Sequence, residues 1–117
     1  MKVGIDLVSI NRFNDLSESF LSRVFTEKEI EYCKKYEKYA EHFAGFFAAK
    51  EAVMKALELG IKETNLKEIE VCHKENGKPF VVITGRVLSV FNNNNLTINE
   101  ISISHTNESA TAVCFMQ

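Results

Sequence analysis

One predicted helix constrains this chain most, because its middle turns carry charges where packing alone would favour apolar side chains. At 3.6 residues per turn, Glu51 and Lys55 project from one side of this helix, while Lys50 interrupts an apolar stripe. Each charge also has an ordinary explanation. An exposed Glu51–Lys55 pair contributes about 0.2–0.5 kcal/mol to helix stability, and a lysine can extend its ammonium to water along a buried stem.

A strand predicted near the start of the chain is apolar except for Asp6. Val3, Ile5 and Leu7 alternate with Asp6 and its neighbours, so both faces of the strand carry apolar residues. Such a strand is expected to be buried, where an ionised carboxylate costs several kcal/mol unless a cation or N–H donors receive it. Asp6 is therefore a candidate ligand. A capping or turn carboxylate at a strand end is an equally weighted alternative.

Near the other end of the chain, a strand predicted to end in Ser102-Ile-Ser-His105 carries a histidine. His105 shares a face with Ile101 and Ile103. Taken alone, such a histidine is more often a packed core or strand-end residue than a catalytic one. Ser104 does not form a nucleophile–base pair with it, because successive side chains of a strand point to opposite faces.

Capping and turn signals predict the remaining elements. Thr26 begins a capping box, and Asn76-Gly77 is a strong hairpin signal. The predicted elements are a first strand within 3–10, helices over 27–36, 38–60 and 85–92, and strands over 67–75, 80–84, 98–105 and 109–116. Helices in the first half and antiparallel strands in the second predict an α+β fold, with the long helix packed on an antiparallel sheet in one domain over residues 1–117.

The composition excludes several classes of protein. A formal charge of -2 lacks the basic excess of a nucleic-acid-binding protein, and no apolar run approaches a membrane span. The cysteines are odd in number and have no C-x-x-C spacing, which favours reduced thiols and a cytoplasmic location. Zinc is not expected at Cys72-His73, because neighbouring strand side chains point apart.

Four motifs in order resemble the phosphopantetheinyl transferases of the holo-acyl-carrier-protein synthase type, over nearly the whole chain. Each motif alone is weak, but their order is specific. The family patterns Gly-x-Asp, Phe-x-x-Lys-Glu-Ala-x-x-Lys-Ala, Asn-Gly-Lys-Pro and Ser-Ile-Ser-His correspond to Gly4–Asp6, Phe47–Ala56, Asn76–Pro79 and Ser102–His105.

This resemblance implies a transferase fold and a reaction. Phosphopantetheine would pass from coenzyme A to a serine of an apo acyl carrier protein, leaving adenosine 3′,5′-bisphosphate. The implied residues are catalytic Asp6, Glu51, Lys55 and His105, with Mg²⁺ on Asp6 and Glu51, coenzyme A on Lys50, Lys55, Gly60 and His105, and the carrier protein on Arg12 and Arg23.

Some roles stay open within this resemblance. Lys50 fits a buried support of the site as well as a direct contact, and His105 would donate a hydrogen bond toward phosphate. The proton of the carrier serine could pass to a carboxylate or to a water at the metal. For Arg12 and Arg23, ordinary surface solvation is an equal alternative. The family forms trimers with active sites at the subunit boundaries, so a homotrimer is expected, and the 45% hydrophobic content can supply its apolar interface.

Two departures from the family pattern bear on coenzyme A. Phe46 stands where family members often have an arginine that binds a phosphate of coenzyme A, and Glu58-Leu59-Gly60 replaces the usual Gly-Thr-Gly. Losing one exposed phosphate contact costs on the order of 1 kcal/mol, roughly a fivefold change in binding. A second hypothesis is therefore a binding module of the same fold, which holds coenzyme A or a carrier protein without turnover.

Overall fold

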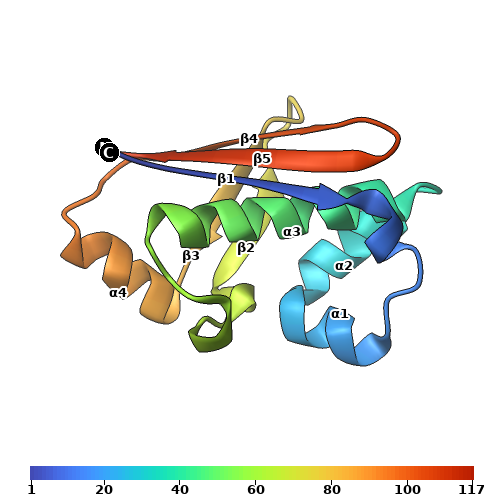
Figure 1. Cartoon of the computed structure of the whole chain (residues 1–117), viewed down its shortest axis with the longest axis horizontal. Helices are drawn as coiled ribbons and strands as arrows, with labels where there is room; N and C mark the ends of the chain where they lie inside the picture. Colours follow the sequence, from blue (N-terminus) through green and yellow to red (C-terminus); the bar gives the residue numbers. More distant parts are fainter.

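The computed structural model describes all residues from 1 to 117. Its helices and strands are β1 (Lys2–Ser9), the 3-10 turn η1 (Ile10–Phe13), α1 (Glu18–Val24), α2 (Glu27–Lys34), α3 (Tyr39–Ala56), η2 (Ile61–Glu63), η3 (Leu66–Glu68), β2 (Ile69–His73), β3 (Pro79–Ile83), α4 (Gly85–Asn93), β4 (Asn99–His105) and β5 (Ser109–Met116). A sheet of β1, β5 and β4 covers one side of α3, while the smaller helices and the β2–β3 hairpin surround the rest (Figure 1). The predicted α+β fold is confirmed.

The first and last strands of the chain are neighbours in this sheet, which is antiparallel throughout in the order β1-β5-β4. The register sets Asp6, Ala112 and Ile103 in one row across the sheet. Two residues further along, Val8 shares a row with Ala110 and the last residue of β4, His105. Both rows face α3. The register therefore places the candidate aspartate and the candidate histidine on opposite edges of one sheet.

Small residues bring β1 unusually close to α3. Ala48 and Ala52 on the helix are fully buried, as is Ala110 on β5. A Cβ on Gly4 would lie 1.9 Å from the carbonyl oxygen of Ala52, so only glycine permits this approach. The two elements of the Gly-x-Asp and Lys-Glu-Ala motifs are thereby held backbone to backbone.

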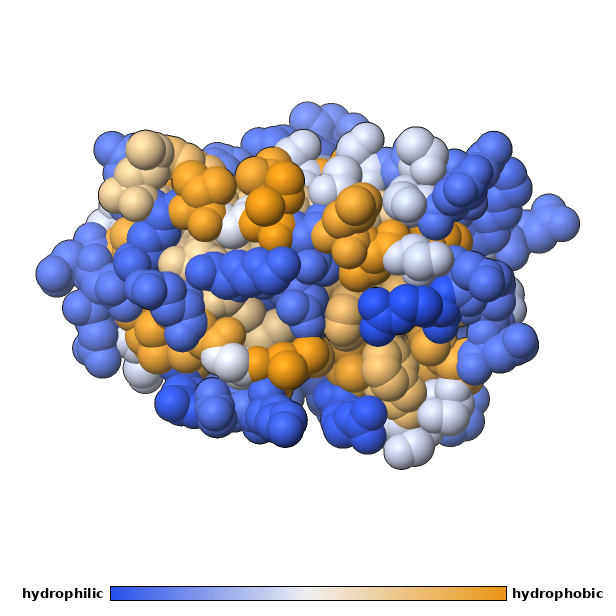
Figure 2. Space-filling view, in the orientation of Figure 1, coloured by the Kyte–Doolittle hydropathy of each residue, from blue (hydrophilic) through white to orange (hydrophobic).

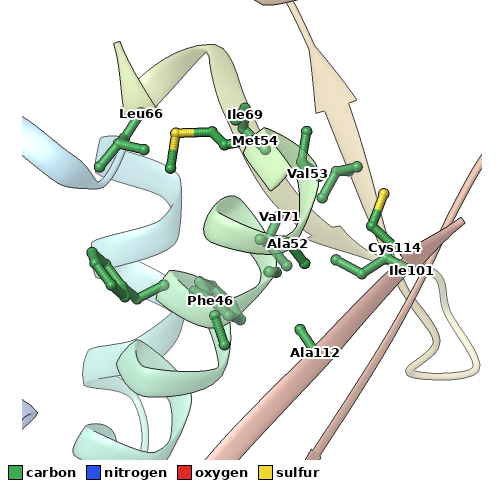
Figure 3. Packing of buried hydrophobic residues seen from close by; sticks show 14 of the residues in the cluster. Phe46, Ala52, Val53, Met54, Leu66, Ile69, Val71, Ile101, Ala112 and Cys114 are labelled. Carbon is green, nitrogen blue, oxygen red and sulfur yellow. The ribbon is translucent and has the colours of Figure 1, made fainter. Parts of the chain in front are cut away.

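Larger side chains fill the core on either side of this contact. Figure 3 shows Val53 and Met54 of α3 among the buried side chains of the cluster, together with Ile101 of β4 and Ile69 of β2. The four residues are at most 4% exposed, which places the helix at the centre of the core. No helix of the chain is long and apolar enough to cross a membrane.

The predicted hairpin is confirmed between β2 and β3. Gly77 has φ +88, the left-handed region that favours glycine, and its N–H donates to the carbonyl of Lys74 at 2.8 Å. The capping box at α2 is also confirmed, since Thr26 and Glu29 exchange hydrogen bonds.

Two features of the helices differ from the prediction. Helix α1, capped by the Ser17 side chain, was not predicted, because seven residues give too short an apolar pattern. Helix α3 ends at Ala56 and not at Gly60, because Glu58 adopts φ +57 and the N–H of Leu59 donates to the carbonyl of Met54. Glu58 thus takes the left-handed position at which helices usually place glycine.

The prediction that β1 is buried on both faces is wrong for the single chain. Val3, Ile5 and Leu7 are 57%, 62% and 70% exposed. They form a row on the outer face of the sheet, opposite α3, and Val113 of β5 beside them is 39% exposed. Figure 2 shows hydrophobic side chains in a row along β1. Nothing in the chain itself covers this outer face.

Candidate functional site

Asp6 lies on the inner face of β1 and is only partly satisfied. Its Oδ1 accepts a hydrogen bond from Lys55 Nζ at 3.0 Å, and the same ammonium donates to the carbonyl of Ile5 at 3.1 Å. Its other oxygen, Oδ2, is buried and has no hydrogen-bond partner. Burying a carboxylate oxygen without a hydrogen-bond donor costs free energy, and a cation bound to this oxygen would offset that cost.

Glu51, on α3, lies close enough to Asp6 for the two carboxylates to repel each other. Burial raises the pKa of the Glu51 carboxyl, and the negative charge of Asp6 raises it further, while Lys55 and Arg12 oppose both effects. A pair of repelling carboxylates with one unused oxygen fits a hard divalent cation such as Mg²⁺, which prefers oxygen ligands. The bland alternative, a Glu51–Lys55 ion pair, is not formed, because Lys55 turns to Asp6.

Arg12 and Arg23 meet at one groove next to this pair. The guanidinium of Arg12 lies 5.7 Å from the Phe47 ring centroid, and that of Arg23 lies 5.8 Å from the Phe20 centroid. The groove has a volume of about 590 Å³, and no acidic side chain lines it. Its other lining residues, apolar or uncharged except for Lys62, are Phe20, Val24, Phe47, Ile61, Thr64, Asn65 and Leu66. The two arginines predicted for docking are therefore brought together over an apolar floor.

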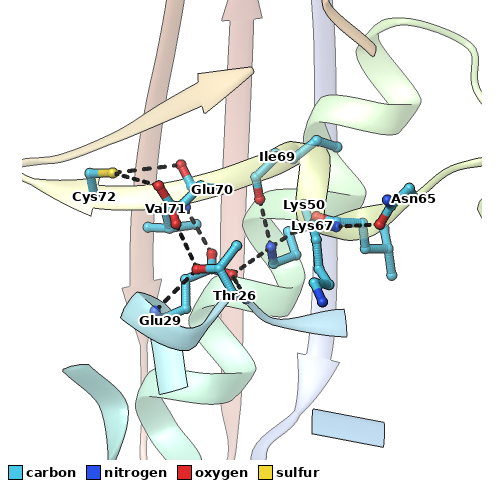
Figure 4. A network of polar contacts seen from close by, with 10 residues as sticks. Thr26, Glu29, Lys50, Asn65, Lys67, Ile69, Glu70, Val71 and Cys72 are labelled. Carbon is cyan, nitrogen blue, oxygen red and sulfur yellow. Dashed lines mark hydrogen bonds and ion pairs between the residues drawn. The ribbon is translucent and has the colours of Figure 1, made fainter. Parts of the chain in front are cut away.

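Lys50 is completely buried, so the prediction that it binds the cofactor directly is wrong. Its ammonium pairs with Glu29 Oε1 at 2.8 Å, and both side chains are 0% exposed. It also donates to the carbonyls of Leu66 and Ile69, as Figure 4 shows for Ile69. Burial lowers the pKa of Lys50, and the charge of Glu29 opposes this shift. Of the open alternatives, the structure supports the buried support of the site.

His105 lies away from the carboxylate pair within one chain. Two strand spacings and two residues separate it from Asp6 in the sheet, which amounts to about 12 Å. Its side chain is 48% exposed, and its Nε2 lies 4.0 Å from Glu41 Oε2 at the start of α3. Gly60 is exposed as well. It directly precedes residues 61–66, several of which line the groove.

Phe46 belongs to the core and not to a surface contact. It is 3% exposed, stacks on Tyr32 with ring centroids 5.5 Å apart, and lies against His73. Tyr32 in turn stacks on His73 at 4.3 Å, nearly parallel. Where family members often carry an arginine, this chain therefore has an aromatic stack that ties α3 to α2 and β2.

Two functional features were missed by the sequence reasoning. Glu29 was recognised only as a capping residue, although it is also the buried partner of Lys50, 21 positions away. Lys62 was not singled out, because a lysine in a polar segment resembles any exposed residue, yet it lines the groove with the two arginines. The sequence contains one signal of the buried Lys50–Glu29 pair, namely that Lys50 interrupts an apolar stripe. It contains no signal of the role of Lys62.

Comparisons with known proteins agree on one family. The family model of the 4′-phosphopantetheinyl transferase superfamily matches residues 2–114. The chain is 44% identical over 118 residues to a holo-[acyl-carrier-protein] synthase of Clostridium botulinum (strain Alaska E43 / Type E3), covering 98% of this chain and 95% of that protein. It is 40% identical over 107 residues to one of Thermoanaerobacter sp. (strain X514), covering 89% and 78%. The Helicobacter pylori synthase crystallised with coenzyme A matches with a TM-score of 0.83 and 32% identity, over 98% of this chain and 99% of that one.

Proposed function

This chain belongs to the 4′-phosphopantetheinyl transferase superfamily, and we propose that it acts as a holo-[acyl-carrier-protein] synthase. It transfers the 4′-phosphopantetheine group from coenzyme A to a serine of an apo acyl carrier protein and releases adenosine 3′,5′-bisphosphate. Residues 1–117 form its single transferase domain. The observation that carries the proposal is the Asp6–Glu51 pair with its unused carboxylate oxygen.

The carboxylate pair and the neighbouring lysine have distinct tasks. Asp6 and Glu51 would hold Mg²⁺, which supplies Lewis-acid neutralisation of the charge that develops on the diphosphate. Lys55 is 54% exposed at its side chain, so its ammonium can reach a phosphate oxygen while it still orients Asp6. Gly60 and His105 line the coenzyme A, and His105 donates a hydrogen bond to a phosphate oxygen.

A homotrimer would bring His105 to the carboxylates of a neighbouring copy. One chain holds the two about 12 Å apart, so a site that uses both is incomplete without a second chain. The exposed outer face of the sheet, with Val3, Ile5 and Leu7, supplies an apolar surface suited to such a contact. We place the trimer interface on this face.

The groove beneath Arg12 and Arg23 is suited to the carrier protein. Its cationic rim complements an acidic partner, and its apolar floor can receive an apolar side chain of that partner. The charge of Arg12 opposes the rise in the pKa of Glu51 that burial and Asp6 cause, so the groove opens beside the carboxylate pair. The free cysteines favour a reducing, cytoplasmic location, where fatty-acyl carriers are loaded.

A binding module without turnover is the weaker alternative. It would need the groove, but it would not need a buried, unpaired carboxylate oxygen of Asp6 near a second carboxylate, which costs stability unless a cation binds there. Phe46 stands where family members often have an arginine, so we expect weaker coenzyme A binding, but both residues of the carboxylate pair are present.

The direct test is the intact mass of an apo acyl carrier protein after incubation with this protein, coenzyme A and Mg²⁺. We expect a gain of one phosphopantetheine, lost when a chelator is added. The Glu51→Gln variant should remain folded and transfer nothing measurable. Its full activity would contradict the role of Glu51 as a metal ligand, and no transfer by the folded wild type to several carriers would favour the binding module.

A further inference from the structure

The buried ammonium of Lys50 uses all three of its donors. It bonds Glu29 Oε1 at 2.8 Å, the carbonyl of Leu66 at 3.0 Å and the carbonyl of Ile69 at 2.5 Å. It also lies 5.6 Å from the centroid of the Phe25 ring. A lysine has three N–H donors and no acceptor, so this arrangement satisfies it completely.

Glu29 is held as firmly as its partner. Its Oε2 accepts the N–H of Val71 at 2.8 Å, and its Oε1 accepts the N–H of Thr26 at 2.9 Å (Figure 4). The pair therefore connects the first turn of α2, the middle of α3 and the start of β2. Its position is determined from both ends and cannot shift without breaking several hydrogen bonds.

Two of the three bonds from Lys50 hold one wall of the groove. The carbonyls of Leu66 and Ile69 lie at the end of the segment 61–69. The other side of this segment faces the groove, where Lys62 and Leu66 line it opposite Arg12 and Arg23. The segment has only short 3-10 turns of its own, so its position depends on such anchors.

The next residue of the same helical turn, Glu51, belongs to the carboxylate pair. Lys50 and Glu51 are about 100° apart around the axis of α3, so one points to the wall and the other to β1. We propose that Lys50 is a positioning residue, which through Glu29 and the carbonyls of Leu66 and Ile69 fixes the groove wall relative to Glu51. This inference rests on the proposed function for the identity of the occupant of the groove, an apo carrier protein.

The alternative is a pair that contributes only to folding. A double variant separates the two, because removing both charges avoids the large cost of leaving one buried charge without its partner. Lys50→Met/Glu29→Gln removes both charges and keeps side chains of similar length, yet it leaves the two carbonyls without their donor. Stability is then recovered in part relative to Lys50→Met, while the segment 61–69 remains without its two bonds to Lys50.

The experiment compares wild type, Lys50→Met and the double variant in two measurements. The first is steady-state transfer, with KM for the apo carrier and kcat determined at a temperature at which each variant is folded by circular dichroism. The second is amide hydrogen exchange of residues 61–69, which needs no activity. We expect the double variant to show KM for the carrier raised roughly fivefold or more and exchange at 61–69 accelerated roughly tenfold or more.

Ile101→Ala is the matched control. Ile101 is 4% exposed in the core of β4 and touches neither the groove nor the ion pair, so its loss lowers global stability without freeing the wall. The proposal is overturned if the double variant has the wild-type KM and wild-type exchange at 61–69, or if Ile101→Ala frees the segment equally. If wild type transfers nothing, the proposed function fails, while the exchange measurement still decides whether Lys50 holds the wall.

Discussion

The charged side chains on two sides of α3 differ in how far the chain itself satisfies them, although Lys50 and Glu51 are consecutive residues. On one side, Lys50 and Glu29 are fully buried and every donor of the ammonium is used. On the other side, Glu51 and Asp6 repel each other, and one oxygen of Asp6 has no partner. The first side, here called the closed side, is satisfied within the chain, whereas the second, the open side, keeps a buried carboxylate oxygen without a hydrogen-bond partner.

Under the proposed function, this difference separates residues that support the structure from residues that perform the chemistry. Charge alone does not distinguish them, since both sides carry charged side chains on regular elements of the same fold. Completeness does distinguish them, because a buried group whose hydrogen bonds are all internal has nothing left for a substrate. The comparison predicts that substitutions on the two sides will affect stability and activity in opposite proportions.

The largest stability effect is expected from Lys50→Met. The variant leaves the Glu29 carboxylate buried without its cation, which costs about 3–5 kcal/mol of unfolding free energy. Urea unfolding followed by circular dichroism measures this. As a control, Lys78→Met removes an exposed ion pair with Glu100 and should leave the unfolding midpoint where it is. Similar midpoints for the two variants would contradict the distinction between the sides of α3.

On the open side, Asp6→Asn should show the opposite pattern, with a large loss of activity and a small change in stability. We expect transfer to fall by roughly a hundredfold or more, because a metal carboxylate is lost. The unfolding free energy should change by less than about 1 kcal/mol, since the Lys55 partner is half exposed and the repulsion with Glu51 is relieved. Mass spectrometry of the carrier gives the rate, and urea unfolding gives the stability. A destabilisation as large as that of Lys50→Met would mean that the open side is structural too.

The sequence singled out the residues of the open side more clearly than the pairing on the closed side. Asp6 and Glu51 each stand in a recognisable motif, so their candidacy needed no contact information. The Lys50–Glu29 pair joins residues 21 positions apart, and its only local signal is that Lys50 interrupts an apolar stripe, which does not identify Glu29 as the partner. Capping and turn signals at Thr26 and Asn76-Gly77 likewise predicted elements correctly because they are local.

Features that depend on the rest of the fold were predicted less well. The outer face of β1 was expected to be buried because Val3, Ile5 and Leu7 are apolar, but burial there requires a surface that the chain does not supply. The end of α3 was set at Gly60 because glycine is the usual terminator. The turn instead forces Glu58 into the left-handed region.

A third prediction concerns this strained residue, which follows the open side of α3. Glu58→Gly should stabilise the chain by about 1 kcal/mol, because a side chain at φ +57 is unfavourable and glycine is not. The exposed Lys2–Glu58 pair, with its 3.5 Å separation, offsets little of this gain. Thermal unfolding measures the change, with Lys2→Met as the control for the lost pair. Destabilisation by Glu58→Gly would show that the Glu58 carboxylate does more than the geometry indicates.

The smallest expected effect is the pH dependence of the unfolding free energy. As pH falls, groups near the closed side should lower this free energy and Glu51 on the open side should raise it. Burial lowers the pKa of His42 and His73, which pack on Tyr36 and Tyr32 beyond the closed side. The unfolded chain then binds protons more readily than the folded one, so stability is lost as pH falls below 6.5. Nearby Glu41 weakens this for His42, and the positive charge of His105 strengthens it.

Glu51 should act in the other direction at lower pH. Its raised folded pKa makes the folded chain bind a proton more readily than the unfolded one, so acidification toward 4.5 relieves its repulsion with Asp6. Because all three groups are partly exposed, each contribution should stay below about 1 kcal/mol. Urea unfolding from pH 7.5 to 4.5 should therefore show a decline that His73→Phe reduces and Glu51→Gln steepens at its acidic end. If both variants shifted the profile in the same direction, the two sides of the helix would not differ in the way their hydrogen bonding indicates.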